Sequence, residues 1–185
     1  LTKLFTSVLV TKFSPDGKNV LFATYFNGSP AQNLKVGVNS AAVSAAGEVA
    51  FGIDTPTVAG LPLVNSTQSH LGTQNNAYVA KLNSAGSALV FGTYLQIGDT
   101  TSPNYLLRGL DVSAAGKVAV TGISGRNSGF PETSPIAGQT CALVAGENSD
   151  GFVALFGTSG TLEFASCLAG STRNGPSPES LRGVA

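Results

Sequence analysis

Charged residues are scarce in this sequence. They make up 11% of the chain, and ten basic residues balance ten acidic ones, whereas an ordinary soluble domain contains about 25% charged residues. Lys and Arg form no cluster, which excludes the basic surface that nucleic acids and anionic membranes require. The surface must instead be covered by Ser, Thr, Asn and Gly, which is typical of secreted or envelope β-proteins and offers little repulsion against association.

Residues that build catalytic and metal sites are also few. The single His, His70, lies in a segment rich in Ser, Gln, Gly and Asn. No Gly-x-Ser-x-Gly motif or second His accompanies it, so an exposed loop residue is favoured over a general base. One His and two Cys do not supply a zinc ligand set, and no glycine-rich phosphate loop is present. We therefore expect a protein that needs no cofactor, and a non-enzymatic role is favoured over an enzymatic one.

The acidic residues are spread singly along the chain. A glycosidase would need two carboxylates about 5–9 Å apart, and nothing in the sequence pairs them. The segments Pro15–Asn19 and Asn148–Gly151 offer oxygen ligands, but both lack the dense Asp pattern that Ca²⁺ favours. We interpret both as Asx/Gly turns and expect no metal site.

Long apolar runs and helical patterns are missing too. No stretch approaches the ~18 apolar residues that span a bilayer, so we expect no membrane insertion. Turn residues interrupt the chain too often for an amphipathic helix of ordinary length. The chain begins with Leu1 instead of Met, from which we expect a processed or cut N-terminus.

What the sequence does contain is an internal repeat with a period of 69 residues. The five residues Val43–Gly47 return unchanged as Val112–Gly116, and Phe22–Tyr25 is echoed by Phe91–Tyr94. A fixed period of this size indicates an array of one supersecondary unit. Within each unit, short runs of alternating apolar and polar residues predict strands, separated by glycine-containing turns.

The repeat predicts an all-β fold without a long helix. We expect eleven strands, at Val8–Phe13, Val20–Phe26, Val38–Val43, Glu48–Ile53, Tyr78–Leu82, Ala88–Leu95, Leu106–Val112, Lys117–Gly122, Phe152–Phe156, Leu162–Leu168 and Leu181–Ala185. Tandem four-stranded antiparallel units are blades of a β-propeller. One propeller domain would comprise a half blade (1–33), two full blades (34–105 and 106–180) and the first strand of another (181–185).

Three segments in order resemble one known repeat. Tyr78–Leu95, Gly109–Gly122 and Gly129–Thr133 are similar to the three parts of the bacterial β-propeller repeat called SBBP. The resemblance implies a propeller in a large secreted or cell-surface bacterial protein, and it implies no activity or catalytic residue. The chain departs from the family at Gln96–Gly98, at Ala42 and at Ser166–Leu168.

The two cysteines both fall in the last copy of the repeat. Cys167 replaces the Tyr of Thr-Tyr-Leu, and Cys141 lies in the long segment before the third strand of that copy. A pair of substitutions confined to one unit favours a disulfide, which an oxidising location would support. The alternative is two unrelated small apolar side chains.

One set of charged residues suggests a ligand site. Arg108 and Arg182 recur inside Leu-Arg-Gly, and Asp111 lies near the first of them. If the first strand of each unit is innermost, these residues flank a central channel, where Arg could bind carboxylate, sulfate or sugar acids. An inter-blade salt bridge is the competing interpretation, and position 39 of the earlier copy is Asn.

Eleven strands cannot close a propeller of four to eight four-stranded blades. We therefore expect an incomplete segment of a larger propeller, whose open edges pair with further blades of the same polypeptide or with another subunit. The leading function is a non-enzymatic scaffold or interaction module, secreted or at the cell surface. The alternative is a carbohydrate-binding or carbohydrate-active propeller with a site at the central channel.

Overall fold

The chain forms β-strands and tight turns. The computed structural model describes residues 8–26, 37–55, 60–69, 76–98, 106–125, 129–139, 141 and 149–168. Its ten strands are β1 (Val8–Phe13), β2 (Val20–Phe26), β3 (Gly37–Val43), β4 (Val49–Thr55), β5 (Asn76–Leu82), β6 (Leu89–Gln96), β7 (Leu107–Val112), β8 (Val118–Gly125), β9 (Ser149–Phe156) and β10 (Leu162–Leu168). This part of the chain contains no helix, which confirms the all-β prediction.

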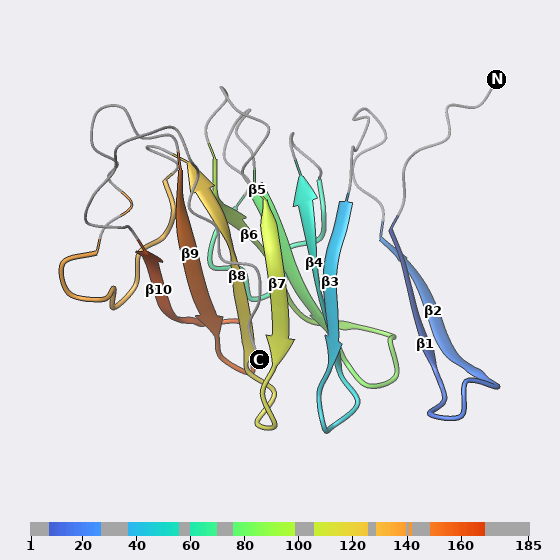
Figure 1. Ribbon diagram of the computed structural model, residues 1–185. Helices are drawn as coiled ribbons and strands as arrows, with labels where there is room; N and C mark the ends of the chain where they lie inside the picture. Colours follow the sequence, from blue (N-terminus) through green and yellow to red (C-terminus); the bar gives the residue numbers. More distant parts are fainter. Residues whose placement is uncertain are drawn as a thin grey trace, which may run out of the picture.

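The strands form three antiparallel sheets that stand side by side (Figure 1). The first sheet contains β1 and β2, the second β3 to β6, and the third β7 to β10, with each strand hydrogen-bonded to its neighbour in sequence. The predicted phase of two, four and four strands is therefore confirmed. The eleventh expected strand, Leu181–Ala185, lies outside the described residues.

The repeated sequence produces repeated turns. In the β3–β4 turn the Ser44 amide donates to the Glu48 carbonyl at 2.9 Å, and the Ser113 amide makes the same bond to Lys117 at 2.9 Å in the β7–β8 turn. β3 and β7, the first strands of the two complete sheets, also have a register shift at equivalent positions, Asn39 and Arg108. A bulge leaves one residue unpaired and redirects its side chain, so Arg108 owes its position to the repeat itself.

The hydrophobic cores lie between sheets. Phe91 of β6 stacks on Phe156 of β9, with ring centroids 5.7 Å apart, between the second and third sheets. Phe26 of β2 packs on Phe51 of β4 at 4.8 Å between the first and second sheets. The first strands β3 and β7 also pack together and run in the same direction (Figure 1).

Each complete sheet has a short edge cap. In the second sheet, the segment that follows β4 passes along the outer edge of β6, where Val64 exchanges two backbone hydrogen bonds with Gly92. Thr133 does the same with Ala165 in the third sheet. Because an uncovered edge strand is open to pairing with other chains, these caps shield the edges of β6 and β10.

One local prediction is wrong. The sequence assigns Asn148–Gly151 to a turn, but Ser149, Asp150 and Gly151 form the start of β9 and are buried. Their strand pairing with β8 outweighs the local turn preference of Asp and Gly, because five further residues of β9, Phe152–Phe156, continue the ladder in the same register. No helix in the described residues is long and apolar enough to cross a membrane.

Candidate interaction surface

The predicted ligand residues are only partly placed. Arg108 lies exposed on the bulge of β7. Asp111 is partly buried three residues further along, where its carboxylate accepts the Val112 amide at 2.8 Å. Arg182 and His70 lie outside the described residues. The described part of the chain holds no cluster of three or more His, Cys, Asp or Glu residues suited to a metal ion.

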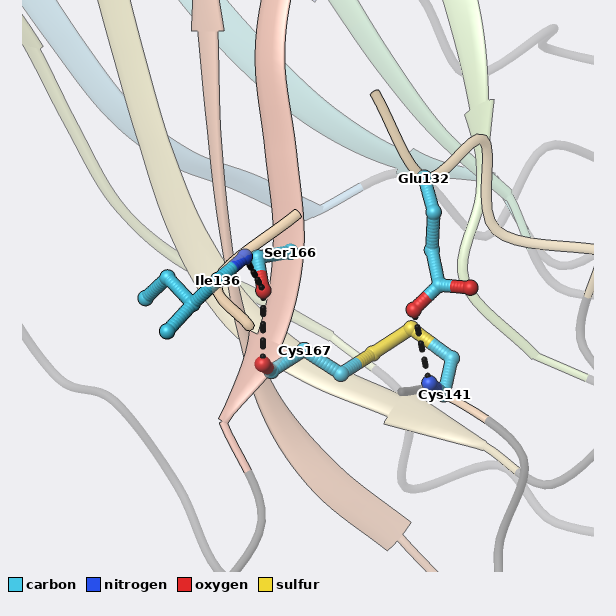
Figure 2. Close-up of a disulfide and its surroundings, with 5 residues drawn as sticks. All are labelled: Glu132, Ile136, Cys141, Ser166 and Cys167. Atoms are coloured by element: carbon cyan, nitrogen blue, oxygen red, sulfur yellow. Dashed lines mark hydrogen bonds between the residues drawn. A yellow bond between two sulfur atoms is a disulfide. The ribbon is translucent and has the colours of Figure 1, made fainter. Parts of the chain in front are cut away.

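The two cysteines lie together and are joined by a disulfide (Figure 2). Their Cα atoms are 5.2 Å apart. Cys167 is fully buried in β10, whereas the Cys141 amide donates to the Glu132 carboxylate at 2.9 Å. The Ile136 amide donates to the Ser166 hydroxyl at 3.2 Å. The disulfide and the Ile136–Ser166 bond attach this segment to β10, the outer strand of the third sheet, while the Cys141–Glu132 bond lies within the segment.

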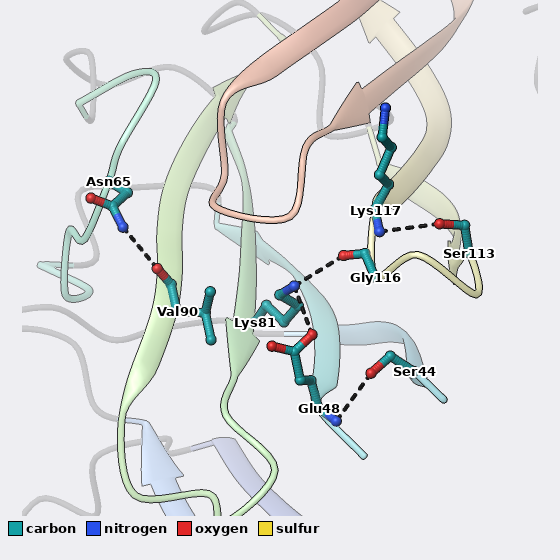
Figure 3. A network of polar contacts seen from close by, with 8 residues as sticks. All are labelled: Ser44, Glu48, Asn65, Lys81, Val90, Ser113, Gly116 and Lys117. Atoms are coloured by element: carbon teal, nitrogen blue, oxygen red, sulfur yellow. Dashed lines mark hydrogen bonds and ion pairs between the residues drawn. The ribbon is translucent and has the colours of Figure 1, made fainter. Parts of the chain in front are cut away.

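A lysine contact recurs across both boundaries between sheets. Lys81 of β5 donates to the Gly116 carbonyl of the next sheet at 2.9 Å and pairs with the Glu48 carboxylate at 2.8 Å (Figure 3). Lys12 of β1, one period earlier, donates to the Gly47 carbonyl at 2.6 Å. The same residue type thus holds the same turn at the same place in two successive units.

A second repeated contact brings a glycine against a phenylalanine. Gly86 and Gly160 occupy the turns between the third and fourth strands of their sheets, at φ +68° and +97°. A methyl group on Gly86 would collide with the Phe22 ring, and one on Gly160 with Phe91. Thr24 also donates to the Gly86 carbonyl at 2.9 Å. Each turn is therefore seated on the fourth strand of the preceding sheet.

The first sheet exposes apolar side chains whose equivalents in the second sheet are buried or half-buried. Tyr25 is 67% exposed, whereas Tyr94 is 2% exposed. Leu9 is 50% exposed, and its equivalent Tyr78 is fully buried. We call this surface the hairpin face. It consists of the exposed apolar side chains of β1 and β2: Leu9, Phe13, Val20, Leu21 and Tyr25.

The second sheet shows what buries the equivalent positions. Its β4 pairs with β5 along the whole strand, and its edge cap reaches both tyrosines. The Tyr94 hydroxyl accepts the Leu61 amide at 2.9 Å, and the Tyr78 hydroxyl donates to the Pro62 carbonyl at 2.6 Å. Burial raises the pKa of both phenols above the ordinary value. The first sheet has no such strand or cap among the described residues.

A groove of about 590 Å³ lies beside β1. One wall is β1, with Leu21 and Pro15, and the other is the apolar face of β3 and β4, including Ala42 and Phe51. In the second sheet the corresponding side of β5 is occupied by β4. The groove and the hairpin face form one continuous surface at the position of two strands that the other sheets have.

Sequence reasoning found the open edge but not the residues that distinguish it. Tyr25 lies in the repeated segment Phe22–Tyr25, and Lys12 aligns with Lys81 at the same offset of 69 residues, so the alignment itself was the available signal. Their roles depend on partners distant in sequence, such as Gly47, which the alignment does not reveal. No protein-family model matches this chain, and no curated protein matches it.

Proposed function

We propose that this chain is a non-enzymatic scaffold made of consecutive blades of a larger β-propeller, related to the SBBP repeat. The observation that supports the proposal best is the recurrence of the same contacts at both sheet boundaries. Lys12 and Lys81 bind successive turns, and Phe22 and Phe91 receive successive turn glycines. A stacking contact that recurs at successive boundaries is expected of a protein whose role is to build an array.

Two features support a secreted or cell-surface location. Disulfides persist in oxidising compartments and are rare in the cytosol, and Cys141 is bonded to Cys167. The surface is also poor in charge, with 11% charged residues in the chain. A scaffold outside the cell would present its polar Ser, Thr and Asn surface to other proteins.

The test separates a scaffold from a carbohydrate-binding propeller. The full chain and an Arg108→Ala variant are applied to a glycan array and to a panel of polysaccharide hydrolysis assays. An antibody against the chain locates the natural protein in fractionated cells. We expect the antibody to find the protein at the cell surface or in the medium. We expect no hydrolysis of any polysaccharide and no glycan binding that depends on Arg108. Saturable glycan binding abolished by Arg108→Ala, or a cytosolic location, would overturn the proposal.

A further inference from the structure

The second sheet shows which elements cover strands equivalent to β1 and β2. β1 and β2 correspond to the third and fourth strands of the complete sheets. In the second sheet those strands are β5 and β6, and they are covered by β3, β4 and the edge cap, which together span residues 37–69. Whatever covers β1 and β2 must therefore reproduce the contacts of such a half unit.

Backbone pairing is the first requirement. β5 bonds β4 on one side and β6 on the other, whereas β1 bonds only β2 among the described residues. An extended segment can add to such an edge through main-chain hydrogen bonds. Its inward side chains would fill the groove against β3 and β4, which is lined largely by apolar residues such as Val10 and Ala42. The occupant is accordingly a strand with apolar residues at alternate positions.

Charge restricts the occupant further. In the second sheet, Lys81 on the third strand pairs with Glu48, which precedes the second strand. In the third sheet the equivalents are Leu155 and Lys117, and Lys117 pairs with Glu163 instead. A lysine on the third strand thus accompanies a glutamate before the second. Lys12 has no carboxylate partner among the described residues, so its missing neighbour should supply one.

The tyrosine gives an independent restriction. Tyr94 needs the Leu61 amide of a Gly-Leu-Pro cap. In the third sheet the position of Tyr94 is Cys167, and the cap residue Phe130 packs on Phe152 at 5.1 Å instead. Tyr25 matches Tyr94, so it suits a cap of the Gly60–Pro62 kind. Both restrictions select the half unit of residues 37–69 over that of residues 106–139.

We propose that β1 and the hairpin face bind the first half of a further repeat unit of the 37–69 kind. This partner is a β-hairpin with a glutamate before its second strand, followed by a Gly-apolar-Pro cap whose amide donates to the Tyr25 hydroxyl. The proposal rests on the scaffold function given above, because it names the partner that such a scaffold takes at this surface.

The experiment restores the missing half in register. A second copy of residues 37–75 is placed directly before residue 7 of the chain, which continues the 69-residue period without a break. Amide hydrogen exchange of β1 is compared between the extended chain and the chain of 185 residues. We expect exchange in β1 to slow by about 100-fold or more, because both edges of the strand become paired. The Tyr25 ring should also lose its reactivity toward nitration.

Two variants test the chemistry of recognition. Glu48→Lys in the appended copy alone should reverse most of the protection, because it places two like charges at Lys12; Glu48→Gln at the same place is the milder control. Tyr25→Phe should leave the 185-residue chain unchanged, since the ring is exposed there. In the extended chain it should speed exchange of β1 by about 2- to 10-fold, the effect of one buried hydrogen bond.

Protection of β8 and β9 shows whether the chain is folded, so a failure to fold can be told apart from a failure of the proposal. Unchanged exchange in β1, while β8 and β9 stay protected, would overturn the proposal, and so would protection that survives Glu48→Lys. Dimerisation of the 185-residue chain that protects β1 would also overturn it, because a second copy would then be the occupant. None of these results bears on the glycan and localisation tests, which judge the scaffold function separately.

Discussion

At the scale of single residues, the most unusual group is a lysine in the core. Lys81 is 1% exposed, and its ammonium is held by one carboxylate and one backbone carbonyl. Removing one partner of a buried ion pair is costly because the other charge is left uncompensated. Glu48 is 24% exposed, so water relieves part of that cost. The third sheet has Leu155 at the same position, which shows that an apolar residue fits when the glutamate is replaced as well.

We expect Lys81→Met to lower the free energy of unfolding by about 2–3 kcal/mol. The matched control is Lys12→Met, which removes the same carbonyl contact without an ion pair and should cost about 0.5–1.5 kcal/mol. The double variant Lys81→Met/Glu48→Gln should recover part of the loss. Urea unfolding of the four proteins provides the measurement. Equal effects of the two lysine variants would show that the Glu48 contact contributes nothing.

Tyr78 predicts a stability limit at alkaline pH. Burial raises the pKa of this phenol well above the usual value of about 10. The folded chain therefore keeps a proton that the unfolded chain releases above about pH 10, so stability is constant below that pH and falls as the pH rises further. Each fully shifted phenol contributes up to about 1.4 kcal/mol per pH unit.

Unfolding in urea between pH 8 and 11 tests this dependence. Tyr78→Phe should give a shallower decline above pH 10 than the natural chain, although it loses the hydrogen bond to Pro62 and so starts from a lower stability. Parallel slopes for the two proteins would contradict the assignment to Tyr78.

At the scale of elements, the turns between third and fourth strands fix the distance between sheets. Gly17, Gly86 and Gly160 occupy the same position in three turns, all with positive φ. A methyl group would meet Phe22 at Gly86 and Phe91 at Gly160, but nothing at Gly17. The same substitution therefore separates backbone strain from the loss of packing between sheets.

We expect Gly160→Ala to cost about 2–5 kcal/mol, because a left-handed residue with a side chain is strained and the extra methyl group overpacks Phe91. Gly17→Ala should cost about 1–2 kcal/mol from the backbone alone. Thermal and urea unfolding supply both values. Equal destabilisation of the two variants would show that the contact between Gly160 and Phe91 tolerates a methyl group.

The disulfide acts on another element, the segment that caps β10. Cys141 and Cys167 close a loop of 26 residues, for which the chain-entropy account gives about 3 kcal/mol. Cys141→Ala should therefore lower the free energy of unfolding by about that amount. A reducing agent should lower the natural chain to the level of the variant and leave the variant unchanged. A variant as stable as the oxidised chain would contradict a stabilising role.

The strands were readable from the sequence, and the contacts between sheets were not. Alternation of apolar residues and the glycine turns placed all ten described strands, because both signals are local. The edge caps at Val64 and Thr133 depend on pairing with residues about thirty positions away, and no local propensity encodes that pairing. The buried strand start at Ser149–Gly151 was missed for the same reason, since its partner β8 decides its conformation.

At the scale of the whole molecule, the sheets resemble one another but differ in how completely they are covered. Strands β1 and β2 are equivalent to β9 and β10, yet the first sheet has two strands where the third has four. In a repeat array each unit is stabilised mainly by its own strands and its nearest neighbours. The exposed apolar side chains of the hairpin face therefore mark the region of lowest local stability.

We expect β1 and β2 to open well before the rest of the 185-residue chain. Their amides should exchange at least about 100-fold faster than those of β9 and β10. The strands β9 and β10 have equivalent positions in the repeat, but they lie in a four-stranded sheet whose edge is covered by a cap and held by a disulfide. Hydrogen exchange read by mass spectrometry on peptides from the two hairpins measures the difference directly. Reduction of the disulfide serves as the internal control, because it should speed exchange in β10 without changing β1. Equal protection of the two hairpins would mean that the contacts of Lys12 and Phe26 with the second sheet suffice to hold the first, and that its open edge costs the molecule nothing.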